Sequence, residues 1–366
     1  MTDFDYGNAR LRAMKSRLLP RRSLEELAEA GSVQGLITAL TNTAYREAVE
    51  MALVRLTGIE CLAEALRNDL VATLGKARAF FSGSAGDLAA LVLRRYDVHN
   101  LKTVLRGLER HVPANEILAN ILPVGELRPA DLAELARAAS VRVAIDLLAT
   151  WGMPLARPLL ELRAVERGGN GGAELFEMEL ALDRWHMRTA LEAAATLDSG
   201  SVLREALALD ADAVNILTAL RLVGVPAPHL AAALPDRAGS GEVMILFVGP
   251  GRVPFDLLAD AAHQESVPRA VERLAGTPYA ESLMSALDAY AASARLSVFE
   301  HALAQRRLRF AAGLLARDPL GIGVLLSYVA LKTTEVTNIR AIAQGLMLGE
   351  KPDRIRAELM FVVGSP

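Results

Sequence analysis

The sequence has little cysteine, few aromatic residues and almost no net charge. Its 366 residues include one cysteine, Cys61, so an intrachain disulfide is impossible and a thiolate metal site is not expected. Lysine and arginine number 40 and aspartate and glutamate 43, a net charge of −3, which argues against a nucleic-acid binder that depends on a basic excess. Hydrophobic residues make up 52% of the chain, which excludes a disordered polymer.

Long apolar runs are also missing. Two apolar uncharged stretches are residues 319–331, 13 residues, and 243–251, nine residues, and no uncharged stretch in the sequence exceeds 16 residues. A membrane-spanning helix needs about 18 or more apolar residues. The first five residues are acidic and no signal-peptide-like apolar stretch follows them. We therefore expect a soluble protein of a reducing cytoplasm, at most peripheral to a membrane.

The composition and the apolar spacing favour helices over sheets. Aromatic residues are 5% of the chain, and residues 96–110 and 296–314 carry apolar side chains at helical spacing. The best strand candidate, residues 243–248, has no partner strand, so we interpret it as a helix end or an extended connector. The fold class predicted is all-α. Glycine-rich and polar stretches predict linkers at residues 167–172, 197–201 and 235–241.

The chain repeats itself internally. Residues 20–45 match residues 254–279 at 8 of 26 positions without a gap, including a Ser-Val pair and a closing Thr-x-Tyr. A fainter middle copy contains Ser140-Val141 and then Thr150-Trp151. Residues 121–125 also match residues 245–249. These matches predict three helical repeat units with boundaries at 1–120, 121–244 and 245–366.

The second half of each unit carries a carboxylate and an amide three residues apart. The pairs are Asp97 with Asn100, Asp212 with Asn215, and Glu335 with Asn338. At this spacing both side chains lie on one helix face, where they can hydrogen-bond a neighbouring segment. Because the pair recurs in every copy, we interpret it as a structural clamp rather than a catalytic site.

Patterns that support catalysis are not complete anywhere in the sequence. Gly75-Lys76 is followed by alanine and lacks the first glycine of a phosphate-binding loop. Gly321-x-Gly323 lacks the third glycine of a dinucleotide fingerprint. The six histidines form no metal-binding spacing, and Cys61 lies in an apolar helical context that should raise its pKa. We therefore expect no catalytic, cofactor-binding or metal-binding residue and no cofactor.

Two further groups of residues are candidates for binding surfaces. The arginine runs 94–95 and 306–309 are typical of solvated faces with nearby acids, and a rim that meets an acidic partner is the alternative. Trp151 and Trp185 are more typical of core anchors than of stacking platforms.

Four phrases together resemble a known family. They are YxxARxRAMKxxLL from Tyr6, YDVxNLK from Tyr96, EVxNIRxIAxG from Glu335 and GxxPxxIR from Gly349. In this order and spacing the chain resembles the C-subunit family of rotary V/A-type ATPases, whose vacuolar members are called d subunits. The middle copy departs from the pattern, with Trp151 near the place that tyrosine takes in the other copies, and residues 168–172 form a glycine-rich insert.

The resemblance implies a fold and a role. It implies a funnel or tripod of three similar helical domains with pseudo-threefold character and no catalytic activity. Such a protein would be a central-stalk rotor part, a socket between the axle subunits of D and F type and the proteolipid c-ring. It would link ATP synthesis or hydrolysis to proton or sodium transport on the cytoplasmic face of the membrane, without nucleic acid and without a transmembrane segment of its own. The resemblance names no residue at either interface.

Two other readings compete with this one. A soluble helical-repeat scaffold that binds an unrelated partner would share the same repeats. An all-α enzyme of the prenyl-synthase kind would need Asp-Asp-x-x-Asp boxes to bind metal-bound pyrophosphate, and the sequence contains no Asp-Asp pair.

Overall fold

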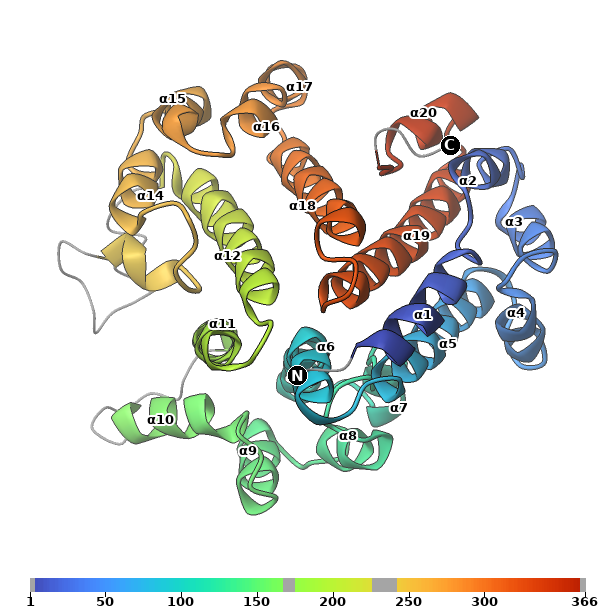
Figure 1. The fold of residues 1–366 in the computed structure, drawn as a ribbon, viewed down its shortest axis with the longest axis horizontal. Coiled ribbons are helices and arrows are strands. Elements are labelled where there is room, and N and C mark those ends of the chain that lie inside the picture. The colour runs from blue at the N-terminus through green and yellow to red at the C-terminus, as the bar shows by residue number, and fades with distance from the viewer. Residues whose placement is uncertain (1–3, 167–174, 226–241, 363–366) are drawn as a thin grey trace. The chain divides into compact units, whose positions relative to one another are not determined.

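The computed structural model describes residues 4–166, 175–225 and 242–362, and these residues form helices joined by short turns (Figure 1). Within these ranges there is no strand, which confirms the all-α prediction. The predicted linkers 167–172 and 235–241 lie outside the described residues. The third, 197–201, is a turn at residues 197–200 followed by a helix that begins at Ser201.

The first half of the chain contains ten helices in the described part. They are α1 (Asp5–Lys15), α2 (Arg21–Leu27), α3 (Val33–Leu40), α4 (Arg46–Leu53), α5 (Gly58–Ala79), α6 (Gly83–Glu109), α7 (Ala114–Leu118), α8 (Pro129–Ala136), α9 (Val141–Thr150) and α10 (Ala156–Glu166).

The second half has the following elements in its described part. They are α11 (Leu175–Thr196), α12 (Ser201–Leu222), the 3-10 helix η1 (Glu242–Leu246), α14 (Phe255–Ala262), α15 (Val267–Arg273), η2 (Leu274–Gly276), α16 (Ala280–Met284), α17 (Leu287–Ser293), α18 (Ser297–Arg317), α19 (Gly323–Met347) and α20 (Pro352–Ala357). The strand candidate at 243–248 is therefore η1 and the extended residues after it, as the helix-end interpretation predicted.

The chain divides into two compact units. One contains Met1–Ala156, Leu197–Leu203 and Leu308–Pro366, so it joins the two ends of the chain. In this unit α19 packs against α1, α2, α3 and α5, and α6 packs against α7, α8 and α9. The other unit contains Arg157–Thr196 and Arg204–Arg307, where α14 packs against α15 and η1.

The Ser-Val pair of the repeat marks the start of a helix in each copy. Ser32, Ser140 and Ser266 are the N-caps of α3, α9 and α15, all with extended backbone. The hydroxyl of Ser32 accepts from the Gly35 N–H at 3.0 Å, and that of Ser140 from the Val143 N–H at 3.3 Å. A serine in this place satisfies an amide that the first helical turn leaves unpaired.

Long helices with apolar faces form the core. In α5, Leu62, Leu66, Leu70 and Leu74 are buried at a spacing of four residues. Cys61 is also buried, and burial raises the pKa of its thiol, as the sequence predicted. Trp185 is a core residue, whereas Trp151 is only half-buried. Among the described residues no helix is both long enough and apolar enough to cross a bilayer.

Candidate functional site

The three carboxylate–amide pairs are all buried in the helices that carry them. α6 carries Asp97 and Asn100, α12 carries Asp212 and Asn215, and α19 carries Glu335 and Asn338, each no more than 4% exposed. Burial of such groups is costly unless their hydrogen bonds are replaced. Their partners therefore identify what each pair holds. We call each pair and its backbone partners a clamp.

The asparagine side chain of each clamp hydrogen-bonds the backbone of a downstream segment, through both its NH2 donor and its carbonyl oxygen acceptor. Asn100 accepts from the Leu122 N–H at 2.7 Å and donates to the Leu122 carbonyl at 2.8 Å. Asn338 makes the same two bonds with Met360, at 2.9 and 2.8 Å. Asn215 accepts from Val248 and donates to the Gly249 carbonyl, both at 2.9 Å. An asparagine side chain thereby replaces a missing backbone partner.

The carboxylates of the first two clamps bind consecutive backbone amides. Asp97 accepts from the N–H groups of Glu126 and Leu127, at 2.7 and 3.0 Å. Asp212 accepts from those of Arg252 and Val253, at 2.8 and 3.1 Å. The hydrogen bonds that the sequence pattern predicted for these pairs are thus confirmed.

A glycine lets the backbone reach each of these two carboxylates. A Cβ on Gly125 would stand 2.1 Å from Asp97 Oδ2, and one on Gly251 would stand 1.9 Å from Asp212 Oδ1. These contacts correct the match of residues 121–125 with 245–249. By hydrogen-bonding role, Leu122 corresponds to Val248 and Gly125 to Gly251, so the match is displaced by two residues. Identical apolar side chains produced the incorrect alignment, because the clamp contacts backbone atoms and does not depend on those side chains.

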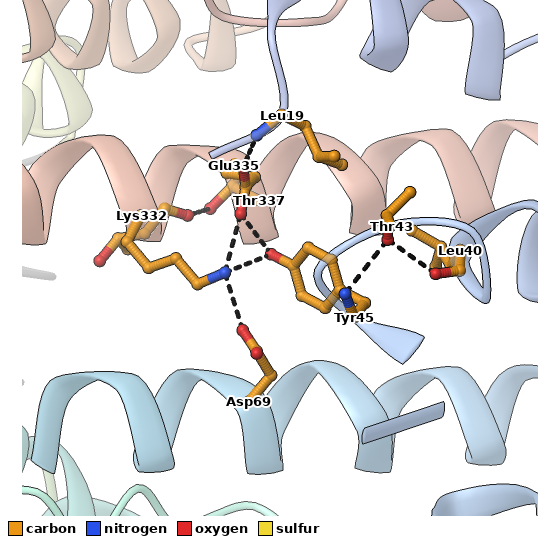
Figure 2. A network of polar contacts seen from close by, with 9 residues as sticks. Leu19, Leu40, Thr43, Tyr45, Asp69, Lys332, Glu335 and Thr337 are labelled. Carbon is orange, nitrogen blue, oxygen red and sulfur yellow. Dashed lines mark hydrogen bonds and ion pairs between the residues drawn. The ribbon is translucent and has the colours of Figure 1, made fainter. Parts of the chain in front are cut away.

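In the third clamp, the carboxylate binds a backbone amide of the N-terminal segment. Glu335 accepts a hydrogen bond from the Leu19 N–H (Figure 2). Leu19 directly precedes Pro20, the N-cap of α2, just as Val253 precedes Pro254, the N-cap of α14. Glu335 therefore takes the role of Asp212, but its backbone partner lies 316 residues earlier. The last copy of the repeat is therefore hydrogen-bonded to the first copy, and both residues belong to the same compact unit.

Two clamps are completed by a tyrosine hydroxyl. Tyr45 donates to Glu335 at 2.6 Å, and Tyr279 donates to Asp212 at 2.7 Å. Burial and the neighbouring carboxylate raise the pKa of both phenols, so each stays a protonated donor. No hydroxyl of the described residues reaches Asp97, whose backbone partners Glu126 and Leu127 belong to the middle copy, where Trp151 stands near the place of the tyrosine.

The third clamp alone contains a buried lysine. Lys332 Nζ lies 2.8 Å from Glu335, 2.8 Å from the Tyr45 hydroxyl oxygen and 2.7 Å from Asp69 on α5 (Figure 2). It also lies 4.1 Å from the Tyr45 ring centroid. One ammonium between two carboxylates offsets part of the cost of burying them. Neither Lys332 nor Asp69 could be recognised from the sequence, where the only signal is a lysine three residues before Glu335.

The carboxylates of the clamps are engaged in structural contacts. They are turned toward backbone amides, and within the described part of the chain no three His, Cys, Asp or Glu side chains are placed to hold a metal ion. Two arginines of the run 306–309 have partners within the second unit: Arg307 lies 2.6 Å from Asp210, and Arg306 stacks over Tyr279 at 5.0 Å. One acid of the kind expected beside this run, Asp210, is therefore present. Arg94 and Arg95 are half-buried rather than on an open face.

Comparison with known proteins decides the family. The sequence matches the family described as ATP synthase (C/AC39) subunit over residues 7–358. The chain belongs to this family. Members of the ATP synthase (C/AC39) subunit family are structural subunits of the complex rather than catalytic ones, so the chain is not an enzyme.

Relatives match this chain over nearly its whole length. It is 29% identical to the A-type ATP synthase C subunit of Halobacterium salinarum, covering 98% of each chain. It is 27% identical to the A-type C subunit of Haloferax volcanii, covering 98% of this chain and 97% of the relative. It is 26% identical to the V-type ATP synthase C subunit of Deinococcus radiodurans, covering 98% and 91%. The family resemblance given by the four sequence phrases is confirmed.

Because Gly251 lies so close to Asp212, the substitution Gly251→Ala tests how much the clamp contributes to stability. In Gly251→Ala the new Cβ must displace the loop from the buried carboxylate, and we expect the free energy of unfolding to fall by about 2–4 kcal/mol. The matched control is Gly313→Ala in α18, where a Cβ meets nothing within 4 Å. That change should raise the free energy of unfolding by about 0.5–1 kcal/mol. Urea denaturation measures both, and equal stabilities would contradict the clamp.

The Asp97 clamp, which has no tyrosine, should make the free energy of unfolding depend on pH. Burial raises the pKa of Asp97 to about 6, more than the bonds from Glu126 and Leu127 lower it. Because the unfolded aspartate titrates near pH 4, the folded protein binds the extra proton between about pH 4 and 6, so the free energy of unfolding falls as pH rises through this window. The contribution is on the order of 3 kcal/mol. In Asp97→Asn the free energy of unfolding should no longer show this fall between about pH 4 and 6. Identical pH dependence in the wild type and the variant would contradict a raised pKa for Asp97.

Proposed function

We propose that this protein is the central-stalk rotor subunit of a V/A-type ATP synthase, a socket that joins the central axle to the proteolipid ring. Its task is to pass torque between the two, so that ATP synthesis or hydrolysis is linked to proton or sodium transport. The observation that carries the proposal is the family match over residues 7–358 in a chain whose clamps are buried and structural.

A torque-transmitting part must resist deformation, and the clamps support this role. Densely packed helices provide a stiff body. In this chain the two ends are also tied together, since Glu335 near the C-terminus binds the Leu19 amide and the Tyr45 hydroxyl. A load applied to either end of the chain must then act on buried hydrogen bonds, each of which is costly to leave unsatisfied.

The expected partners follow from the same role. The axle side would bind subunits of D and F type and the other side the proteolipid c-ring, on the cytoplasmic face of the membrane. We also propose that the three repeat units, 1–120, 121–244 and 245–366, present similar faces to these partners. Binding to a ring of many identical subunits would depend on contacts distributed over a wide interface rather than on one specific pocket.

A complex lacking this subunit tests the proposal. We expect the soluble head alone to hydrolyse ATP, whereas ATP-driven ion transport into vesicles should require the added wild-type chain. The chain, tagged and purified from detergent-solubilised membranes, should also carry axle and ring subunits with it. Gly313→Ala, which alters the chain without touching a clamp, should restore transport as well as the wild type does.

Two results would contradict this role. One is full ion transport without the chain; the other is recovery of the chain as a bare monomer under conditions that keep the rotary complex intact. Recovery with an unrelated protein would instead support the scaffold reading of the repeats.

A further inference from the structure

The outward side of α1 and the turn after it form a positively charged surface. Arg10, Arg12, Lys15 and Arg17 are all exposed, and none of them forms an ion pair with a carboxylate of the described residues. Some exposed arginines elsewhere are paired along their helices, as Arg46 is with Glu50 and Arg269 with Glu272. The surplus lies at one end of a chain whose total charge is −3.

Aromatic rings are fixed beside these cations. Tyr6 is 64% exposed and lies edge-on to Phe80, with ring centroids 6.1 Å apart. The Arg10 guanidinium lies over the Phe80 ring at 5.5 Å. Gly7 seats α1 on the neighbouring Phe81, since a Cβ there would stand 2.2 Å from that ring. The tyrosine, the phenylalanine and the arginine are therefore held in place before any partner arrives.

The other flank of α1 presents an exposed leucine. Asn8 donates to the Gly321 carbonyl at 3.1 Å and Arg12 donates to the Pro319 carbonyl at 2.7 Å. These bonds hold the turn between α18 and α19 against α1, and Leu320 at its tip is 73% exposed. We call Tyr6, Arg10, Lys15, Arg17, Phe80 and Leu320 the α1 patch; α1 itself is the dark blue helix of Figure 1.

We propose that the α1 patch is a docking surface for an acidic helical segment of the axle, an inference that rests on the proposed socket function. Exposed tyrosine and arginine side chains are typical of protein interfaces. The cations require negative charge on the partner, and arginine forks bind carboxylates with two parallel hydrogen bonds. A helix lying along α1 could place acidic side chains against both Arg10 and Arg17.

A lipid surface fits the patch less well. Membrane-bound amphipathic helices bury an apolar face several ångströms into the headgroup layer. The apolar face of α1 is occupied instead, because Phe4, Gly7 and Leu11 are buried. Tyr6 rests edge-on against Phe80, so it is not free to insert. Bound vesicles are therefore an outcome of the test, not the expectation.

Charge reversal on the full-length protein tests this assignment. The variant Arg10→Glu/Arg17→Glu should bind the purified axle subunits at least about tenfold more weakly than wild type in a titration at low salt. The wild-type affinity should fall with added salt more steeply than that of the variant. The control, Arg142→Glu/Arg269→Glu, makes the same charge change at two exposed arginines elsewhere, on α9 and α15, and should bind as wild type does. Tyr6→Ala is a second variant, which removes exposed contact area without adding charge, and it should also weaken binding.

The possible results separate this inference from the proposed function. Equal axle affinity in wild type and in both α1 variants overturns the docking surface and leaves the socket function standing. Loss of binding to the isolated ring, or to vesicles of anionic phospholipid, with axle affinity retained would also overturn it. If the wild-type chain itself does not bind the axle subunits, both the inference and the socket function fail.

Discussion

The structure depends on how buried carboxylates are satisfied by backbone amides. An ionised carboxylate inside a helical protein is costly unless several donors surround it. Asp97 and Asp212 each accept from two consecutive N–H groups, and Glu335 accepts from an N–H, a phenol and an ammonium. Each of the backbone N–H bonds fixes a segment that belongs to no helix, just before the next helix begins. Packing alone would not select that position.

The same interaction joins the two ends of the chain. In the first two clamps the amides that bind the carboxylate belong to the segment that follows in sequence, whereas Glu335 takes its amide from Leu19. As a result α19 lies against α1, α2 and α3. The proposed role in torque transmission uses this closure, because a body with tied ends resists unravelling under load. The three clamps are not equal: among the described residues, Asp97 alone lacks a hydroxyl donor.

The fold class and part of the clamp could be predicted from the sequence. Spacing places Asp97 and Asn100 on one helix face, and recurrence in three copies indicated a structural role. The partners could not be found this way, because a carboxylate binding backbone N–H groups leaves no side-chain signature at Leu19 or Val253. Tyr45 and Glu335 lie 290 residues apart, so only the fold brings them together. The two-residue error in matching residues 121–125 has the same origin.

Native-state amide hydrogen exchange, followed by NMR, tests the clamps most directly. The amides of Leu19, Leu127 and Val253 lie outside helices, so without a buried acceptor they would exchange like those of an open loop. The clamps predict that all three are protected nearly as well as helical core amides. They also predict that Tyr45→Phe speeds exchange at Leu19 and leaves Leu127 unchanged. Exchange of Leu19 and Val253 at the rate of an unstructured peptide would contradict the account.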